Sequence, residues 1–247
     1  MPYLVAATEA GRAAGDLLRA RFQQPRTVNA TTKHDIKLDV DVEAQDLIAK
    51  MLLTRFPEHA FYGEEGIVGD QSSEYQWVVD PLDGTVNYFY GLPHFCVSIA
   101  LRFQGDVIVG VIFDPIRGEL WTTEKGGPPL LNGKEIHVSA RAQLSEAMLS
   151  VGLAKTSTTI NAGLPLLEQM AHRARKCRLL GSAALDLAYI ACGRLDAYIE
   201  QGISLWDIAA GWLLVENAGG RVDLRPRSDM PDKFGIVASN GLLDLGL

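Results

Sequence analysis

One run of residues in the first half of the chain combines an apolar strand, two aspartates and two residues that restrict the backbone. The run is Trp77-Val78-Val79-Asp80-Pro81-Leu82-Asp83-Gly84-Thr85. Pro81 fixes its φ angle and Gly84 permits a sharp reversal, so Asp83 can fold back beside Asp80 at the end of the strand. Two carboxylates held this close repel each other unless a cation lies between them. We therefore expect a fold in which a buried strand ends at a cation-binding turn.

The residue types around this turn indicate which ligands it would take. Oxygen ligands without histidine or cysteine select a hard cation, Mg²⁺ or Mn²⁺ before Zn²⁺. The segment Thr85 to Tyr88 can begin a helix, whose first amides would face an anion such as phosphate. The alternative is a plain Asx-rich turn, since Asp-Gly often forms one. Proline, glycine and threonine in register after an apolar strand favour the metal and phosphate interpretation.

Two further acidic groups lie far from this run in the sequence. Glu64 and Glu65 stand between glycines, directly after a strand expected over 60–62. They can converge on a ligand, but for this pair alone the sequence favours a solvated turn. Asp207 stands at the start of an amphipathic helix expected over 208–218. It could be a ligand or a simple N-cap, and by itself the sequence leaves both open.

The order of the expected elements predicts two α+β lobes rather than a doubly wound sheet. Apolar residues at helical spacing predict helices over 3–22 and 42–56. Short apolar runs then predict strands over 60–62, 76–79, 96–103, 107–113 and 120–123. In the second half, strands are expected over 148–151, 178–180, 197–200 and 235–238, and helices over 164–175, 183–192 and 207–218. We place the lobes at 1–145, with most of the metal ligands, and 146–247, with Asp207.

Composition argues against several classes of partner. A net charge of −7 and a pI near 5.3 argue against a nucleic-acid-binding protein. The one basic cluster, over 173–178, is interpreted as a solvated face. Three cysteines without a CxxC pair indicate reduced thiols in the cytoplasm. The N-terminus lacks the features of a signal peptide, and no apolar run reaches the length of a membrane span, so we expect no membrane partner.

Four blocks in a fixed order resemble the signatures of the inositol monophosphatase family. They are Gly63-Glu-Glu, Trp77-x-x-Asp-Pro-Leu-Asp-Gly-Thr-x-Asn, Arg178-Leu-Leu-Gly-Ser-Ala-Ala and Trp206-Asp-Ile-Ala-Ala-Gly. The resemblance runs from about residue 35 to residue 240. It implies an α+β fold, a five-layer αβαβα sandwich like that of fructose-1,6-bisphosphatase, with the site between two lobes. It also implies a Mg²⁺-dependent phosphoric monoester hydrolase of the inositol-phosphate phosphatase type.

The resemblance assigns metal and catalytic roles position by position. Glu64, Asp80 and the carbonyl of Leu82 would hold the first of two to three Mg²⁺ ions, and Asp80, Asp83 and Asp207 the second. Glu65 matches a ligand less well. Thr85 and Asp41 resemble the pair that orients the attacking water, to which Glu64 would also contribute through its metal. The backbone amides of Gly84 and Thr85 would receive a phosphate oxygen.

The resemblance also places the substrate. Gly181, Ser182 and Ala183 match the loop that lines the alcohol part, and Glu200 matches a glutamate that accepts hydrogen bonds from ring hydroxyls. Asp83 and Asp207 would also lie against the substrate. A small polyol or sugar phosphate such as inositol monophosphate is therefore expected, rather than a nucleotide. Alternatively, Glu200 is an exposed carboxylate at a strand end.

The sequence is also compatible with other functions. Related substrates are fructose-1,6-bisphosphate, histidinol phosphate and 3′-phosphoadenosine 5′-phosphate, and a different class of function is that of a non-catalytic regulatory partner. The resemblance implies a homodimer. The chain departs from the family pattern in the segment before Asp41. Leu38 stands where relatives carry a threonine, and the lysine that relatives carry in this loop has no exact counterpart, because Lys33 and Lys37 are both offset from its position.

Overall fold

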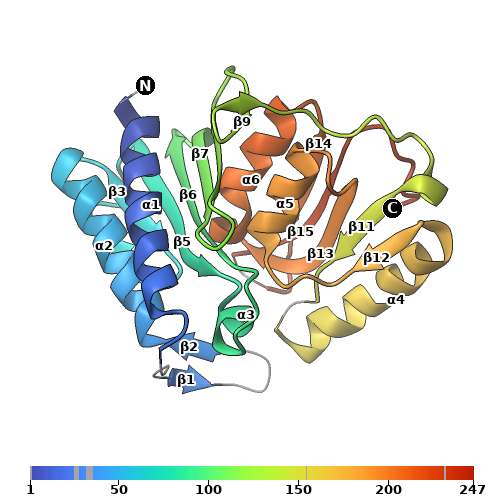
Figure 1. Cartoon of the computed structure of the whole chain (residues 1–247), viewed down its shortest axis with the longest axis horizontal. Coiled ribbons are helices and arrows are strands. Elements are labelled where there is room, and N and C mark those ends of the chain that lie inside the picture. The colour runs from blue at the N-terminus through green and yellow to red at the C-terminus, as the bar shows by residue number, and fades with distance from the viewer. Residues whose placement is uncertain (1, 25–27, 32–35, 154, 231) are drawn as a thin grey trace.

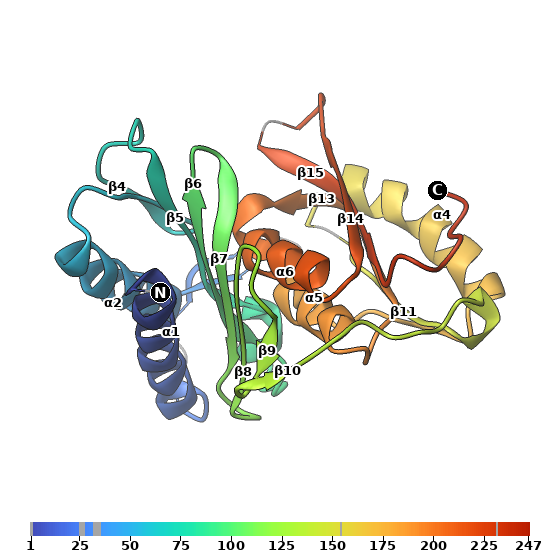
Figure 2. The same cartoon turned by 90° about the horizontal axis from the view of Figure 1, so that it is seen from above.

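Two β-sheets with a pair of helices between them set the architecture of the chain, as the computed structural model shows (Figures 1 and 2). The structure describes residues 2–24, 28–31, 36–153, 155–230 and 232–247. From one side to the other the layers are a helix pair, the first sheet, a second helix pair, the second sheet and a single helix. The predicted five-layer αβαβα sandwich is thereby confirmed.

The first sheet has eight strands in the order β10-β9-β8-β7-β6-β5-β3-β4. Neighbouring strands are antiparallel except β3 and β5, which are parallel. The strands are β3 (Ala60–Gly63), β4 (Gly66–Val68), β5 (Tyr75–Asp83), β6 (Cys96–Phe103), β7 (Asp106–Asp114), β8 (Glu119–Glu124), β9 (Leu130–Leu131) and β10 (Lys134–Glu135).

Helices α1 (Pro2–Arg21) and α2 (Asp39–Arg55) cover the outer face of the first sheet. The buried side of α1 consists largely of alanines, with Leu18 at its end. Small side chains let the helix approach the sheet closely. A Cβ atom on Gly15 would lie 2.4 Å from the ring of Phe113 on β7, so this crossing requires glycine.

The second sheet has five strands in the order β12-β11-β13-β15-β14. They are β11 (Met148–Val151), β12 (Lys176–Arg178), β13 (Ala197–Ser204), β14 (Arg221–Pro226) and β15 (Lys233–Ser239). β11 runs parallel to β12 and β13, whereas β15 is antiparallel to both of its neighbours. Helix α4 (Ser157–Arg173) lies on the outer side.

Helices α5 (Ala183–Ala191) and α6 (Leu205–Asn217) fill the layer between the sheets. Nearly every residue of α5 is buried, as expected for a helix with neighbours on all sides. α6 packs tightly on β7, because a Cβ atom on Gly110 would lie 2.7 Å from the carbonyl oxygen of Ala210. The central helices therefore link the two sheets rigidly.

The remaining elements are short. They are β1 (Val28–Thr31), β2 (Ile36–Leu38), α3 (Thr85–Phe89) and a 3₁₀ turn, Leu144–Glu146. Within the described ranges, no helix has the combination of length and apolar character needed to cross a membrane. The strands of the first sheet all precede residue 136 and those of the second follow residue 147. The division into lobes 1–145 and 146–247 stays a prediction.

Several predicted elements differ from the observed ones at their ends. The predicted strands over 96–103 and 148–151 match β6 and β11, but β5 continues past residue 79 to Asp83 because its pairing with β6 resumes after a bulge. Helix α4 begins at Ser157, not at residue 164, since the Thr156 side chain accepts a hydrogen bond from the amide of Thr159. The strand predicted over 178–180 is wrong: β12 covers 176–178. β4 and β14 were missed.

Candidate active site

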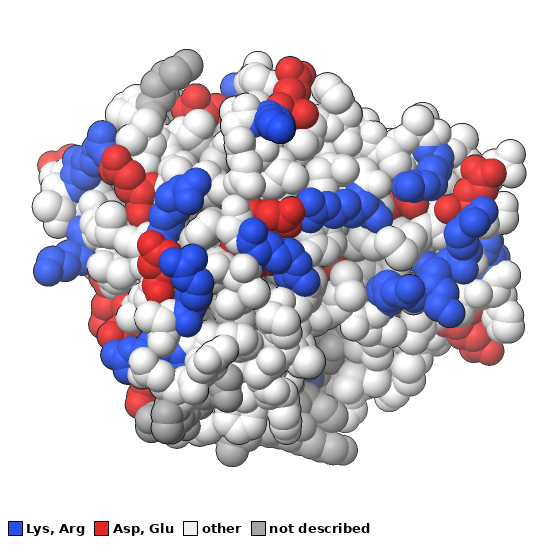
Figure 3. Space-filling model, viewed as in Figure 1, with Lys and Arg blue, Asp and Glu red and all other residues white. Residues whose placement is uncertain are grey.

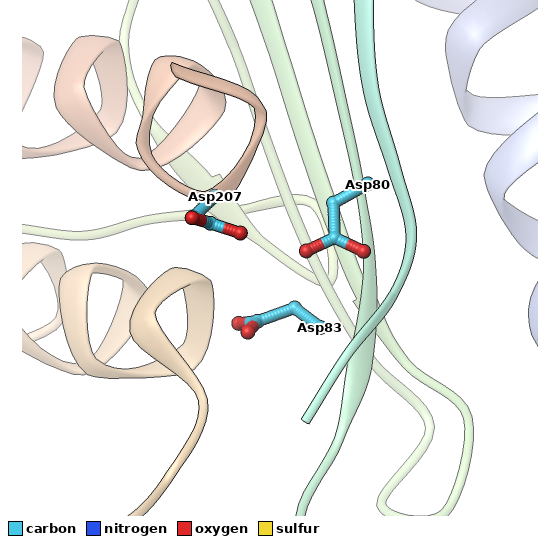
Figure 4. Close-up of side chains that lie close together, drawn as sticks. All are labelled: Asp80, Asp83 and Asp207. Atoms are coloured by element: carbon cyan, nitrogen blue, oxygen red, sulfur yellow. The ribbon is translucent and has the colours of Figure 1, made fainter. Parts of the chain in front are cut away.

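Three aspartates from two parts of the fold point toward one another (Figure 4). Asp80 and Asp83 belong to β5 of the first sheet, and Asp207 belongs to the first turn of α6. Each offers a carboxylate oxygen that lies within 4.8 Å of those offered by the other two. The sequence had placed Asp80 and Asp83 together. The structure brings Asp207 to them across 124 residues, as the family resemblance implied.

The bulge at the end of β5 explains how the first two aspartates share a side. Antiparallel pairing with β6 is interrupted between Asp80 and Asp83, which lets both carboxylates turn the same way. The amide of Leu82 donates to Asp80 Oδ1 at 2.9 Å and fixes that carboxylate. Gly84 then reverses the chain with φ of 98°, and a Cβ atom there would lie 2.9 Å from the carbonyl oxygen of His94. The positive φ angle and the close approach to His94 together explain why this position needs glycine, as the sequence predicted.

The other two carboxylates are held from the central helix layer. Asp83 Oδ2 accepts hydrogen bonds from the Ser182 hydroxyl at 2.6 Å and from the Ala184 amide at 2.7 Å, both at the start of α5. Asp207 Oδ2 accepts from the Ser204 amide at 2.9 Å. The alternative that Asp207 is the N-cap is wrong, because Ser204 is the N-cap and Asp207 is the third residue of the helix.

Burial makes this cluster costly without a cation. Burial raises the pKa of Asp80 well above its usual value, and the neighbouring charges of Glu64, Asp83 and Asp207 raise it further. The pKa of Asp83 rises to about 7 for the same reasons, although its hydrogen bonds from Ser182 and Ala184 oppose the rise. Carboxylates this close share either protons or a cation. The donor set consists of carboxylate oxygens, two of the three aspartates being buried, and it fits a hard divalent cation such as Mg²⁺.

Glu64 and Thr85 lie around the same cavity, but their partners differ. Lys155 Nζ lies 3.6 Å from Glu64 Oε1, and the Thr85 hydroxyl donates to the Leu82 carbonyl at 3.0 Å. That carbonyl was itself expected to be a metal ligand. Glu65 forms an ion pair with Lys37 at 3.1 Å, while Lys33 lies outside the described residues.

Asp41 stands apart from this group. It is buried at the start of α2, where its Oδ2 accepts from the Leu38 amide at 2.8 Å. Burial raises its pKa to about 7, and the charges of Glu64 and Glu65 add to the effect. Within the described part of the chain, its Oδ1 has no hydrogen-bond partner and no hydrogen bond joins it to Thr85. Its predicted partnership with Thr85 stays a prediction.

One cavity of about 430 Å³ connects these residues to the second half of the chain. Most of the residues predicted for the site line it: Glu64, Asp80, Leu82, Asp83, Gly84, Thr85, Gly181, Ser182, Ala183, Glu200 and Asp207. Asp41 is not among its lining residues. This volume is within the usual range for a small-molecule site.

Glu200 belongs to the wall of the cavity formed by β13. It is 7 % exposed, so the alternative of an exposed strand-end carboxylate is wrong. The Tyr198 hydroxyl donates to Glu200 Oε2. Burial raises the pKa of Glu200 to about 7, an effect that the Tyr198 hydrogen bond and the charges of Lys155 and Lys233 oppose. A buried acceptor of this kind suits hydroxyl donors.

Among the polar residues that line the cavity and that sequence reasoning missed are Asn87, Lys155, Asp186 and Lys233. Asn87 Nδ2 donates to the carbonyl oxygens of His94 and Leu180, both at 2.9 Å, and so ties the metal loop to the loop before α5. Asp186 is buried and accepts from the Ser150 hydroxyl at 2.7 Å. Asn87 was visible in the motif, but the other three are brought in only by strand pairing and helix packing.

The face of the molecule drawn in Figure 3 carries charges of both signs. The exposed arginines and lysine over 173–178 lie where α4 ends and β12 begins. In Figure 3, basic side chains gather on the right of the molecule, the side on which Figure 1 places α4. Exposure of these residues is consistent with the predicted solvated face.

Comparison with known proteins gives consistent results. The model of the inositol monophosphatase family matches residues 1–245. A protein of Xylella fastidiosa named Nus factor SuhB is 42% identical over 243 residues, covering 94% of this chain and 88% of that protein. Inositol-1-monophosphatase of Mesorhizobium japonicum is 38% identical over 244 residues, covering 97% and 92%. The crystal structure of extragenic suppressor protein SuhB from Bartonella henselae has a TM-score of 0.91 at 33% identity, covering 98% and 95%.

Proposed function

The chain belongs to the inositol monophosphatase family, and we propose that it is a Mg²⁺-dependent phosphomonoesterase acting on inositol monophosphate or a similar small polyol or sugar phosphate. The observation that carries this proposal is the meeting of Asp80, Asp83 and Asp207 in one cavity that Glu200 also lines. Carboxylates that come from β5 and α6 have no evident structural reason to converge at a bulged strand end. A cation-dependent reaction gives these carboxylates a reason to converge.

Two groups of residues in the cavity would have different roles. Glu64, Asp80, Asp83, Asp207 and the Leu82 carbonyl would hold two to three Mg²⁺ ions, with Mn²⁺ as a substitute. When bound, the ions lower the pKa of a water molecule and neutralise the phosphate and the leaving oxygen. The amides of Gly84 and Thr85 would bind a phosphate oxygen, and Asp41 with Thr85 would orient the attacking water.

A second group of cavity residues would hold the alcohol. The loop from Gly181 to Ala183 lies at the start of α5, and Glu200 faces the cavity from β13. Glu200 would accept hydrogen bonds from substrate hydroxyls, and its burial makes such bonds stronger than in water. This arrangement favours a polyol over an apolar or purely aromatic alcohol.

A substrate panel tests the proposal. Phosphate release would be measured from inositol 1-phosphate, fructose-1,6-bisphosphate, histidinol phosphate and 3′-phosphoadenosine 5′-phosphate, with Mg²⁺, with EDTA and after Mg²⁺ is restored. We expect metal-dependent turnover that is highest on a polyol or sugar phosphate. Asp83→Asn should abolish it, whereas Asp16→Asn, on the exposed side of α1 and paired with Arg19 at 2.8 Å, should not. Absence of metal-dependent turnover on every ester would refute the proposal.

A second candidate is a regulatory binding role, because one relative at 42% identity is named a Nus factor. The two functions are separable by Asp83→Asn in a strain that lacks the wild-type gene. If the variant folds, loses turnover and restores the phenotype, the binding role is favoured. If it fails to restore the phenotype, catalysis is the function that the cell requires.

Other properties are proposed on narrower grounds. The acidic charge of −7 supports the absence of a nucleic-acid partner, and the three free cysteines support a cytoplasmic location. We also propose a homodimer, by analogy with the family, and no membrane partner. Sedimentation of the purified chain and a binding assay with RNA and DNA would test the dimer and the nucleic-acid proposals.

A further inference from the structure

One side chain of the cavity joins α3 to two separate loops. Asn87 is the third residue of α3, two residues after Thr85. Its Nδ2 atom donates to the carbonyl oxygen of His94 at 2.9 Å and to that of Leu180 at 2.9 Å, 93 residues away in the sequence. A carboxamide has two N–H donors, so these two bonds use both of them. None of the roles given so far to the metal ligands or to Glu200 explains why both donors point at loop carbonyls.

The bond to His94 acts on the turn of Gly84 and Thr85, whose amides would bind phosphate. Gly84 packs directly against the His94 carbonyl, since a Cβ atom on Gly84 would lie 2.9 Å from that oxygen. Asn87 therefore holds the same carbonyl against which this turn packs. The backbone of Asn87 holds the loop as well, because its carbonyl oxygen accepts a hydrogen bond from the Leu92 amide at 2.8 Å.

The bond to Leu180 acts on the loop that leads into α5. Gly181 follows with φ of 79°, and a Cβ atom there would lie 3.1 Å from Asn87 Nδ2, so the loop lies directly against the carboxamide. The next residue, Ser182, donates to the Asp83 carboxylate at 2.6 Å. The carbonyl that Asn87 binds thus lies two residues before the hydroxyl that holds a metal ligand.

The packing of α3 does not depend on Asn87. The next residue, Tyr88, is fully buried, and its hydroxyl donates to the Leu18 carbonyl at the end of α1 at 3.0 Å. Asn87 is only half-buried and faces the cavity. The core therefore fixes α3 through Tyr88, and the carboxamide is left to act on the two loops.

We propose that Asn87 is a positioning residue of the active site, which holds the loop from Leu180 to Ser182 against the phosphate-binding turn and acts on the substrate through that loop. This inference rests on the proposed phosphatase function and gives Asn87 no contact with the reacting atoms. Without the carboxamide the loop loses its attachment to α3. The Ser182 hydroxyl and the surface that lines the alcohol are then less precisely placed, and small misplacements of this kind are costly in an active site.

A double-mutant cycle tests the inference, because two residues that act through one loop are not independent. kcat/KM on inositol 1-phosphate would be measured at one fixed Mg²⁺ concentration for Asn87→Ala, Ser182→Ala and the double variant. We expect each single substitution to lower kcat/KM by about tenfold, and the double variant to lose about tenfold to thirtyfold, not the hundredfold of independent losses. For Asn87→Ala the loss should lie mainly in KM for the inositol ester and be smaller on p-nitrophenyl phosphate, which has no hydroxyls to be positioned.

Two further variants complete the experiment. Asn161→Ala, at an exposed position on α4, is the control and should leave both esters unaffected. Asn87→Asp keeps the size of the side chain but has no N–H to donate, so it should give the same cycle and serves if Asn87→Ala does not fold.

Unchanged kcat/KM in the Asn87 variants, an equal loss on both esters, or a double variant that loses the product of the two single losses would overturn the positioning role. Each of these results would leave the phosphatase function standing. Absence of metal-dependent hydrolysis of both esters by the wild-type chain would overturn both.

Discussion

The hydroxyl of Ser182 donates a hydrogen bond of 2.6 Å to the carboxylate of Asp83, although 99 residues separate them in the sequence. The contact joins the start of α5 to the bulged end of β5. It stabilises the ionised form of Asp83, whose pKa burial raises to about 7. The second half of the chain therefore sets the charge of a metal ligand on the first sheet.

Removal of this hydroxyl should weaken the binding of Mg²⁺ in a pH-dependent way. In Ser182→Ala the pKa of Asp83 rises further, so protons compete more strongly with the cation. We expect the Mg²⁺ concentration for half-maximal activity to rise by about tenfold at pH 6.5, and less at pH 8.5, where Asp83 is ionised in both proteins. Ser73→Ala, which removes an exposed hydroxyl bonded to the Glu58 carbonyl at 2.7 Å, is the control. The same Mg²⁺ requirement at both pH values would contradict the role given to Ser182.

Thermal stability should depend on Mg²⁺ and pH together. The pKa of Asp83 in the folded chain is about 7 and that of Asp80 is also raised, whereas both are near 3.8 when unfolded. A raised folded pKa gives stability that is present below pH 4 and is lost as pH rises toward 7. The metal-free chain should therefore have a lower Tm at pH 8 than at pH 6, and Mg²⁺ should raise the Tm more at pH 8. An equal rise at both pH values, measured by differential scanning fluorimetry, would argue against a cation between these aspartates.

Acid should destabilise the chain through a different residue. Burial, together with the charge of the nearby Arg117, lowers the pKa of His94 to about 4. Because the unfolded side chain takes up its proton near pH 6.5, this contribution to stability is complete above that value and is lost between about pH 6.5 and pH 4. After discounting for partial exposure, the loss is on the order of 2 kcal/mol.

Substitution of His94 separates this loss of stability in acid from the effect of the carboxyl groups whose pKa is raised. Their contribution to stability is lost as the pH rises, not as it falls. His94→Phe keeps an aromatic ring beside Tyr189, whose ring centre lies 6.0 Å away, but cannot take up a proton. Urea unfolding at pH 7 and pH 5 should show a smaller loss for this variant than for the wild-type chain. His172→Phe, at an exposed position on α4, should behave as the wild-type chain does.

Glu200→Gln tests the hydroxyl contact at nearly constant shape. The amide is a weaker acceptor than the carboxylate and leaves the Tyr198 hydroxyl a poorer partner, so recognition of substrate hydroxyls should suffer. We expect kcat/KM on inositol 1-phosphate to fall by about tenfold to a hundredfold, with a smaller fall on p-nitrophenyl phosphate, which lacks the hydroxyls. Unchanged kcat/KM on the inositol ester would remove the main support for a polyol substrate.

The local sequence was sufficient to predict the part of the site that lies within a single loop. Pro81 and Gly84 identified the loop that brings Asp80 beside Asp83, since both act on the backbone directly. The family resemblance, not the local pattern, linked Asp207 to them, because an aspartate at a helix start is also a common cap. The helix boundary shows how weak that local signal was: Ser204 is the cap, and Asp207 lies three residues inside.

Residues brought in by pairing between distant strands could not be predicted in this way. Lys233 lies beside Ser204 only because β15 pairs with β13, and no spacing in the sequence specifies that register. Asp186 lies on a helix that is apolar on every side, where a single acid has no periodic signal. Edge strands such as β4 were missed because three exposed residues carry no alternating pattern.

Gly152 offers a test of how closely the site is packed around Glu200. A Cβ atom on Gly152 would lie 1.7 Å from Glu200 Oε2, whereas its backbone would accept alanine. Gly152→Ala should therefore displace the Glu200 carboxylate without straining the chain locally. We expect the same selective loss on inositol 1-phosphate as in Glu200→Gln. Gly11→Ala is the matched control, since its Cβ atom would meet Val111 at 3.6 Å, an ordinary contact. Full activity of Gly152→Ala on the inositol ester would mean that Glu200 need not hold this position for substrate to bind.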